Sequence, residues 1–212
     1  SIFPRSGAEA RCPRRLACVS DRAPAHGAVV LAAGASTRLG RPKQLVVHRG
    51  ETLVRRAAGL ALATRPRDAA IVLGFAAESV FPQVADLPLR RIDCADWQRG
   101  LGASLRAGVD ALSADCAGVL VVLCDQPALD AAHLLALCDA WRRAPDRGVA
   151  SRYANRIGVP ALLPRSWFDA LDATSDRGMR DLLVQQHDRI DAIANEALAV
   201  DIDVPGDLGH LR

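Results

Sequence analysis

A loop of small residues and cations follows an apolar run at residues 28–33. Gly34 allows backbone amides to approach an anion closely, and successive amides in such a loop can surround a phosphate. Arg38, Arg41 and Lys43 add three cations within six residues. The lysine stands further from the first glycine than it does in a P-loop. The pattern therefore predicts a phosphate-binding loop of another kind, and the alternative is an ordinary strand–helix connection with solvated arginines.

Lys43 is also the only lysine among the 27 basic residues of the chain. A lysine in an arginine-rich background indicates a chemical need for a compact ammonium, which a planar guanidinium cannot replace in a tight loop. The alternative is that its survival is a coincidence of composition.

Carboxylates follow two other apolar runs. Asp125 directly follows the clearest buried run, residues 118–124. Asp201 and Asp203 lie at the end of a strand predicted over residues 197–202. Residues i and i+2 of a strand point to the same side, so both carboxylates of the last pair could face one site. Two such strand ends can together hold Mg²⁺ beside a polyphosphate. The alternatives are a helix cap or turn for Asp125 and a solvated strand end for Asp201 and Asp203.

A fourth segment, residues 96–108, has glycines at the start of a predicted helix. Gly100 and Gly102 begin a dinucleotide-binding pattern, but Leu105 stands where its third glycine belongs, and this failure disfavours a dehydrogenase. The helix N-terminus still offers free amides and the Ser104 hydroxyl to a polar ligand. The alternative is plain capping of the helix.

Apolar runs alternate along the chain with segments of helical spacing. The predicted strands are residues 28–33, 69–74, 89–92, 118–124, 148–152, 157–163 and 197–202, and the predicted helices are residues 52–63, 78–85, 103–112, 130–143, 167–171 and 179–186. Continuous apolar strands predict an α/β fold with a mostly parallel sheet and helices on both faces, to which a hairpin over residues 148–163 adds one antiparallel strand. Ligands of such folds bind at the carboxyl ends of strands.

Composition and charge limit the function further. The chain has 212 residues, half of them hydrophobic, and its net charge of +3 comes from residues 1–26. The rest of the chain is balanced, which argues against a nucleic-acid partner. The longest apolar run is far shorter than the ~20 residues that span a bilayer, which excludes a transmembrane protein. Residues 1–26, rich in Arg, Pro, Ala and Gly, are predicted to be a flexible leader, and residues 27–212 to be one domain.

The six cysteines include no CxxC pair, and no zinc site is expected of Cys12 and Cys18. The four cysteines in or near apolar stretches are expected to be buried: Cys94, Cys116, Cys124 and Cys138. Reduced cysteines and the lack of an export signal predict a cytoplasmic protein.

In this order, the segments resemble the nucleotidyltransferase family that attaches a nucleotide to molybdenum cofactor, especially its cytidylyltransferase branch. The resemblance covers about residues 26–208. Its four motifs are LAAGASTRLGRPKQL at residues 31–45, GLGASLRAG at 100–108, CDQP at 124–127 and DIDVPGDL at 201–208. The departures from the family pattern are Leu39, Leu101, Cys124, Val204 and Gly206.

The resemblance implies a single-domain Rossmann-like nucleotidyltransferase fold and a role for each matching residue. Gly34, Arg38 and Lys43 would bind the triphosphate, with Lys43, Arg38 and Asp125 as the catalytic residues. Asp125 and Asp203 would hold Mg²⁺, for which Mn²⁺ is an alternative, and the choice between Asp201 and Asp203 stays open. The nucleoside would lie near Ala32, Ala33 and Ser104, and the Ala-Ala-Gly form is similar to the branch that uses CTP. The acceptor would be lined by Gly158, Pro160, Asp176, Arg177 and Gly178.

The resemblance also implies a reaction, the transfer of CMP from CTP to molybdopterin or its molybdenum form with release of pyrophosphate. The five histidines are not needed for this chemistry. The alternatives are GMP transfer and nucleotidyl transfer to a sugar or alcohol phosphate. A non-catalytic nucleotide-binding accessory protein for molybdoenzyme maturation belongs to another class. The implied partners are CTP or another NTP, the molybdopterin-type acceptor, and a molybdoenzyme or its chaperone.

Overall fold

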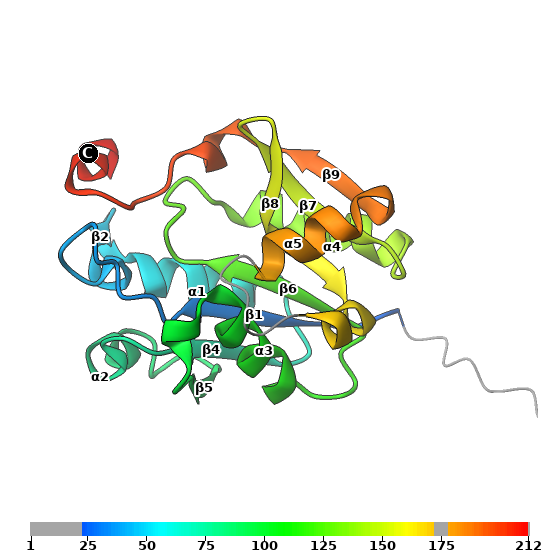
Figure 1. Cartoon of the computed structure of the whole chain (residues 1–212), viewed down its shortest axis with the longest axis horizontal. Coiled ribbons are helices and arrows are strands. Elements are labelled where there is room, and N and C mark those ends of the chain that lie inside the picture. The colour runs from blue at the N-terminus through cyan, green and yellow to red at the C-terminus, as the bar shows by residue number, and fades with distance from the viewer. Residues whose placement is uncertain (1–22, 172–177, 212) are drawn as a thin grey trace, which may run out of the picture.

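Seven strands form one mixed sheet at the centre of the computed structural model, which describes residues 23–171 and 178–211 (Figure 1). In sheet order, the strands are β5 (Arg90–Asp93), β4 (Ala69–Leu73), β1 (His26–Ala32), β6 (Gly118–Leu123), β8 (Arg156–Pro164), β7 (Gly148–Tyr153) and β9 (Ile190–Ala194). Only β8 runs antiparallel to its neighbours β6 and β7, while the other pairs are parallel. The predicted α/β fold with a mostly parallel sheet is therefore confirmed.

Helices cover both faces of the sheet. α1 (Leu53–Ala63) and α4 (Ala131–Arg143) pack on one face, where the alternate residues Val30, Ile71 and Leu120 point to them. α3 (Leu101–Ala111) and α5 (Gly178–Gln185) pack on the other. The inner strands β1, β4 and β6 are buried on both faces because their residues are apolar without alternation. The short helix α2 (Ala77–Val80) and a two-stranded ribbon of β2 (Val47–His48) and β3 (Glu51–Thr52) complete the elements that position the site.

The predicted hairpin over residues 148–163 is also confirmed. β7 and β8 pair in antiparallel fashion around a turn in which Ala154 and Asn155 both have positive φ. Two predicted helices form only partly. Pro82 interrupts the segment 78–85, where α2 gives way to a 3₁₀ turn at Phe81–Gln83, and the segment 167–171 lies in a 3₁₀ helix, Arg165–Ala170.

The strand predicted over residues 197–202 is wrong. Glu196–Ala199 forms a 3₁₀ turn that buries Leu198, and the last strand of the sheet is β9, which lies earlier in the chain. β9 is an edge strand that buries only Ile190, so its sequence lacks the apolar run of an inner strand. The apolar residues of 197–200 follow the 3₁₀ turn instead, and the sequence pattern does not distinguish the two.

Residues 1–22, which include Cys12 and Cys18, lie outside the described residues. His26, the last residue of the predicted leader, belongs to β1. The four other cysteines are buried and free, as predicted. No helix in the described ranges is both long and apolar enough to cross a membrane.

His26 makes stability depend on pH. Its ring is 2% exposed and its Nε2 lies 2.9 Å from Thr64 Oγ1, whose hydroxyl donates to the Ala61 carbonyl. Burial, followed by the charge of Arg142, lowers the pKa of His26 from 6.5 to about 4. Between these values the unfolded chain binds a proton that the folded chain rejects, so stability falls as pH falls through this window.

We expect urea unfolding to report a loss of up to about 3 kcal/mol from His26 between pH 6.5 and pH 4, since one pKa unit corresponds to about 1.4 kcal/mol. His26→Gln keeps a donor for Thr64 and should flatten this part of the slope. The buried His133, whose pKa is also lowered by burial, supplies a remaining slope in both proteins. An unchanged slope in His26→Gln would contradict the assignment.

Candidate functional site

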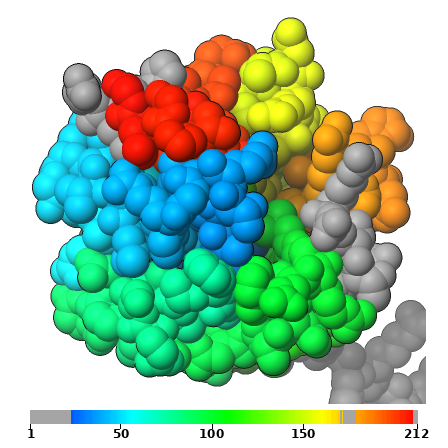
Figure 2. All heavy atoms as spheres, turned by 60° about the vertical axis from the view of Figure 1, so that its left-hand side comes forward, coloured from blue at the N-terminus to red at the C-terminus, as the bar shows by residue number. Residues whose placement is uncertain are grey.

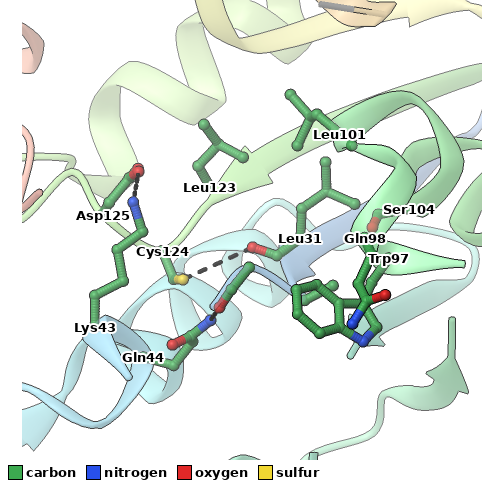
Figure 3. Close-up of a pocket in the computed structure, with 13 residues that line it drawn as sticks. Leu31, Lys43, Gln44, Trp97, Gln98, Leu101, Ser104, Leu123, Cys124 and Asp125 are labelled. Carbon is green, nitrogen blue, oxygen red and sulfur yellow. Dashed lines mark hydrogen bonds and ion pairs between the residues drawn. The ribbon is translucent and has the colours of Figure 1, made fainter. Parts of the chain in front are cut away.

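A cavity of about 330 Å³ opens at the carboxyl ends of the two central strands, β1 and β6 (Figure 3). Ala33 and Gly34 line it from the end of β1, and Cys124 and Asp125 line it from the end of β6. The first turn of α3 closes a further side with Ser104. Three segments that are distant in the sequence therefore meet at the edge of the sheet where ligands of α/β folds bind.

The loop after β1 holds itself in shape. Ser36 has a positive φ of 54° and accepts backbone hydrogen bonds from Leu39 and Gly40 through its carbonyl. Its Oγ accepts from the backbone amide of Lys43 at 3.1 Å. A non-glycine residue in the left-handed region costs free energy, which these hydrogen bonds offset. A Cβ built on Gly34 would meet no atom within 4 Å, so glycine here leaves the cavity wall open.

The side chain of Gln44 also stabilises the start of this loop. Its side chain is 1% exposed and its Nε2 donates to the carbonyl oxygens of Ala32, at 2.9 Å, and Gly34, at 2.8 Å. Both carbonyls are thereby occupied by the side chain of Gln44, which fixes the start of the loop. Sequence analysis did not single out Gln44. Its position directly after Lys43, as a polar residue leading into a buried segment, is the only signal in the sequence.

A network of four side chains lies at one end of the cavity, and two of them, Lys43 and Asp125, line its wall. The Lys43 ammonium lies 2.6 Å from Asp125 Oδ2 and 2.9 Å from Asp203 Oδ1. The second oxygen of Asp203 accepts from Arg38 at 2.7 Å. The lysine and Asp125 side chains are mostly buried, while Arg38 is 73% exposed and lies outside the cavity wall. Two carboxylates and two cations thus balance in charge.

The C-terminal segment brings Asp203 to this network. Ile202 is fully buried against Leu39, Val46 and Leu53, and its backbone amide donates to the Asp125 carbonyl at 2.9 Å. Asp207 Oδ2 then accepts from the amides of Asp203 and Val204 at 2.8 Å each. Figure 2 shows this segment lying over the part of the chain that contains the loop after β1. Asp203 is therefore positioned by the residue before it, Ile202, and by Asp207, which follows it in the sequence.

The network perturbs the ionisation of its members. Burial lowers the pKa of the Lys43 ammonium, but the charges and hydrogen bonds of Asp125 and Asp203 outweigh burial and raise the pKa above its ordinary value. Lys43 therefore remains charged. Burial, and then the charges of Asp125 and Asp203, raise the pKa of Asp201. Asp201 lies near the network, while Asp203 is the carboxylate in contact with Lys43 and Arg38.

The other residues predicted for the nucleotide lie at different places. Ala33 and Ser104 line the cavity, but Ala32 is 1% exposed and packs into the core on the α1 side of the sheet. The prediction that Ala32 lies under the base or ribose therefore has no support in the cavity wall, because β1 turns its side chain toward α1. Gly100, whose φ of 110° requires glycine, turns the chain into α3.

The residues predicted for the acceptor lie around a second cavity of about 170 Å³. Gly158 lines it, and a Cβ there would meet Tyr153 Oη at 2.7 Å. Pro160 is buried after a cis peptide bond, and its carbonyl accepts from Ser151 at 2.6 Å, so it does not line the wall. Gly178 is the first residue of α5. Asp176 and Arg177 lie outside the described residues.

Comparison with protein families agrees with the motifs. Residues 28–190 match the MobA-like NTP transferase domain, which is well over half of the chain. The chain belongs to this family. The match includes the loop after β1, α3 and Asp125, while Asp203 lies beyond it.

Two kinds of curated protein resemble this member of the MobA-like family. One is nicotine blue oxidoreductase of Paenarthrobacter nicotinovorans, 35% identical over 187 residues, which cover 82% of this chain and 90% of that protein. Another is the bifunctional protein GlmU of Mycobacterium avium, 38% identical over 127 residues, which cover 55% of this chain but 26% of that protein. A chain that matches the NTP transferase family is therefore also similar to a protein named as an oxidoreductase.

Solved structures resemble nearly the whole fold. Rv0371c from Mycobacterium tuberculosis H37Rv gives a TM-score of 0.77 at 26% identity, covering 90% of this chain and 98% of that one. A structure of Rv0371c in complex with manganese gives 0.70 at 25% identity, covering 88% and 97%. A nucleotidyl transferase from Methanothermobacter gives 0.76 at 21% identity over 89% and 96%, which supports the fold alone. Nucleotidyl transfer is the activity that the family match supports.

The charged network suits the divalent metal that a nucleotidyltransferase of this family implies. Asp125 and Asp203 both lie within hydrogen-bond distance of one ammonium, so a single cation can face both. Carboxylate oxygens are hard ligands of the kind Mg²⁺ and Mn²⁺ prefer. Across residues 23–171 and 178–211, no group of three or more His, Cys, Asp or Glu is arranged to hold a metal. The protein therefore offers two carboxylates, and Mg²⁺ sites commonly draw their other ligands from phosphates and water.

Lys43 lies between the two carboxylates that would hold that cation, and removing its charge should make metal binding tighter. We expect Lys43→Met to raise the affinity for Mn²⁺ about tenfold in the absence of nucleotide, because two close carboxylates then lack a counter-ion. Electron paramagnetic resonance of free Mn²⁺ measures this directly. Lys43→Arg keeps the charge and serves as the matched variant, and Asp203→Asn should weaken binding. Weaker Mn²⁺ binding by Lys43→Met would refute the shared cation position.

Proposed function

We propose that this protein transfers CMP from CTP to a molybdopterin-type acceptor, with release of pyrophosphate and with Mg²⁺ as the metal. The observation that carries the proposal is the convergence of Lys43, Asp125 and Asp203 beside the open wall at Gly34. The Ala-Ala-Gly sequence before the loop favours CTP through its resemblance to the branch that uses this nucleotide. Arg38 contributes a further cation at the rim.

The chemistry follows from charge. A terminal phosphate of the acceptor attacks the α-phosphorus of the nucleotide, the bond to the β-phosphate oxygen breaks, and pyrophosphate leaves. The attacking phosphate is already ionised at neutral pH, so no strong general base is needed. Negative oxygens must approach a negative centre, and fixed cations lower the cost of this approach. Asp125 and Asp203 would hold the Mg²⁺, which neutralises the triphosphate when bound.

Lys43 has two partners in this scheme. Without ligand, its ammonium neutralises the carboxylates. With a metal held by the two carboxylates, the ammonium would be free to face the triphosphate beside Gly34, where it would stabilise the charge on the leaving pyrophosphate. Arg38 is mostly exposed, so its guanidinium can bind the same phosphates without a large cost of desolvation. The compact ammonium suits this exchange because it needs no fixed plane, unlike a guanidinium.

The acceptor takes the second cavity in this proposal. Leu101 lines both cavities, so a molecule in the second one reaches the edge of the first. Arg156 and Arg180 lie at its wall beside the apolar side chain of Met179, a combination that suits an anionic group on a flat organic body. Gly158 keeps the wall open by leaving room for Tyr153. Roles for Asp176, Arg177 and Gly178 in acceptor binding stay predictions.

Two alternatives share this chemistry and one does not. GMP transfer, or nucleotidyl transfer to a sugar or alcohol phosphate, would use the same charged network with another base or acceptor. A nucleotide-binding accessory protein for a molybdoenzyme or its chaperone would bind without turnover. The presence of Lys43, Asp125 and Asp203 together favours an active enzyme over the accessory protein.

The likeness to nicotine blue oxidoreductase favours a second candidate function, an oxidoreductase that binds a nucleotide cofactor in the first cavity. The glycine pattern at the start of α3 speaks against a typical dinucleotide site, because Leu105 is fully buried in the core where that pattern has its third glycine. A charged network for polyphosphate and metal is also more than a hydride transfer needs. The transferase therefore remains the first proposal.

One experiment separates these functions. Pyrophosphate release is measured with each of the four NTPs and Mg²⁺, with and without molybdopterin, and oxidation of NADH and NADPH is followed in parallel with a two-electron acceptor dye present. We expect pyrophosphate with CTP only when the acceptor is present. Release of pyrophosphate with GTP, or with a sugar phosphate as acceptor, would replace CTP or molybdopterin as the proposed substrate. Oxidation of a nicotinamide cofactor without pyrophosphate would favour the oxidoreductase, and tight nucleotide binding without either would favour the accessory role.

Asp125→Asn tests the metal role within that assay. The amide has the same shape as the carboxylate but no charge, so the fold should persist while metal-dependent turnover falls about 10³-fold. Circular dichroism and thermal unfolding verify the fold. Asp201→Asn is the matched control, since Asp201 is exposed and does not contact Lys43, and it should keep most of the activity. Full activity in Asp125→Asn would remove the residue from the mechanism.

A further inference from the structure

The first cavity has an aromatic end as well as a charged end. Trp97 lines it together with Gln98, Leu101 and Ser104, while Lys43 and Asp125 line the other end. Figure 3 shows the indole and the lysine on opposite sides of the cavity, with Leu31 between them. A nucleoside triphosphate has the same polarity, with a flat ring at one end and a polyanion at the other. Trp97 was not singled out from the sequence.

Trp97 is held in place by the residues that follow β4. A Cβ built on Gly74 would lie 2.5 Å from Trp97 Cγ, 2.7 Å from Trp97 Cβ and 2.8 Å from the Ala33 carbonyl oxygen. Glycine at this position is therefore what allows the indole to lie so close to the strand end. Phe75 packs edge-on against Trp97, with ring centroids 5.8 Å apart and an interplanar angle of 61°.

The same short segment ties Trp97 to the phosphate-binding loop. The backbone amide of Phe75 donates to the Ala33 carbonyl at 3.0 Å. The carbonyl of Trp97 accepts from the amide of Gly100, the residue that turns the chain into α3. The indole therefore has fixed positions relative to Gly34 on one side and the start of α3 on the other, although its own side chain remains partly exposed.

We infer that Trp97 is the stacking platform for the nucleobase of the NTP, braced by Gly74 and Phe75. The inference rests on the proposed function and deepens it by assigning the end of the cavity that receives the base. A rigid, partly exposed indole beside an apolar side chain such as Leu101 is the kind of surface on which heteroaromatic rings stack. Ser104 and Gln98 lie on the same wall, where polar groups can meet the edge of the ring.

A flat ring in this protein could come from the nucleotide or from a pterin-type acceptor. The geometry favours the nucleotide, because Trp97 shares one cavity with Gly34 and Lys43. The second cavity, assigned above to the acceptor, is lined by Tyr153, Leu101 and Met179 but not by Trp97. Both rings offer the same stacking chemistry, so the experiment must separate them.

Tryptophan fluorescence gives a direct readout. Of the three tryptophans, Trp141 is 0% and Trp167 is 5% exposed, so Trp97 is the one that a ligand can reach. We expect CTP with Mg²⁺ to quench emission in the wild type and not in Trp97→Phe. Tripolyphosphate, which lacks a base, should bind without quenching. Equal quenching by tripolyphosphate would mean that the signal reports a movement of the chain, and would overturn the inference.

Affinities provide the second readout. By calorimetry, Trp97→Leu should weaken CTP binding about tenfold, and Trp97→Phe should stay within about threefold of the wild type, since stacking on a ring is retained. The affinity for tripolyphosphate should be unchanged in both variants. If CTP binds Trp97→Leu as tightly as it binds the wild type, the platform is refuted while the proposed function stands. If the wild type binds neither CTP nor tripolyphosphate with Mg²⁺, the proposed function itself fails.

The brace has its own test with a matched control. Gly74→Ala should weaken CTP binding more than tripolyphosphate binding, because the added methyl must displace the indole as well as crowd the Ala33 carbonyl beside the loop. Gly59→Ala adds the same methyl within α1, where it would meet no atom within 4 Å, and should leave both affinities unchanged. Binding of 6-carboxypterin provides the last arm. Weaker pterin binding but unchanged CTP binding in Trp97→Leu would assign the indole to the acceptor and contradict the inference.

Discussion

The repulsion between two carboxylates is the constraint on which the site depends. Asp125 and Asp203 come from segments far apart in the sequence, and both point at one position beside the loop after β1. Two partly buried carboxylates that both lie within 3 Å of one ammonium would repel each other strongly without a cation between them. Lys43 supplies that cation in the protein alone, so the two carboxylates are held together without a ligand. In the proposed function, the same lysine would be available for phosphate when a metal takes its place.

The fold holds this network with ordinary packing. β1 and β6 are adjacent in the sheet, so the glycine loop and Asp125 lie side by side without further help. Asp203 has no strand to carry it, and its position depends on buried Ile202 and on the cap formed by Asp207. Gln44 performs a comparable task for the loop by occupying the carbonyls of Ala32 and Gly34. The charged groups are thus positioned by the packing of Ile202 and by the hydrogen bonds of Gln44 and Asp207.

The sequence predicted the parts of the structure that depend on local pattern. The buried strands and the loops after them have apolar runs and chemically distinctive ends, and Gly34, Lys43, Asp125 and Asp203 do lie together. What escaped prediction depends on distant contacts. β9 is an edge strand with one buried residue, so no apolar run marks it, whereas residues 197–200 resemble a strand and form a turn. Ala32 and Ala33 are adjacent and identical, and only the direction of β1 decides which one faces the cavity.

Trp97 illustrates the same limit and bears on how related chains can differ in activity. Its place on the cavity wall follows from Gly74 and Phe75, which lie in another loop more than twenty positions earlier, so no local pattern identifies it. A cavity with one aromatic end and one charged end suits any nucleotide, whether substrate or cofactor. In the proposed function, the carboxylate pair and the lysine between them commit such a cavity to phosphoryl chemistry. A relative that keeps the aromatic end but loses the carboxylate pair would still bind a nucleotide, and its chemistry would then come from the cofactor.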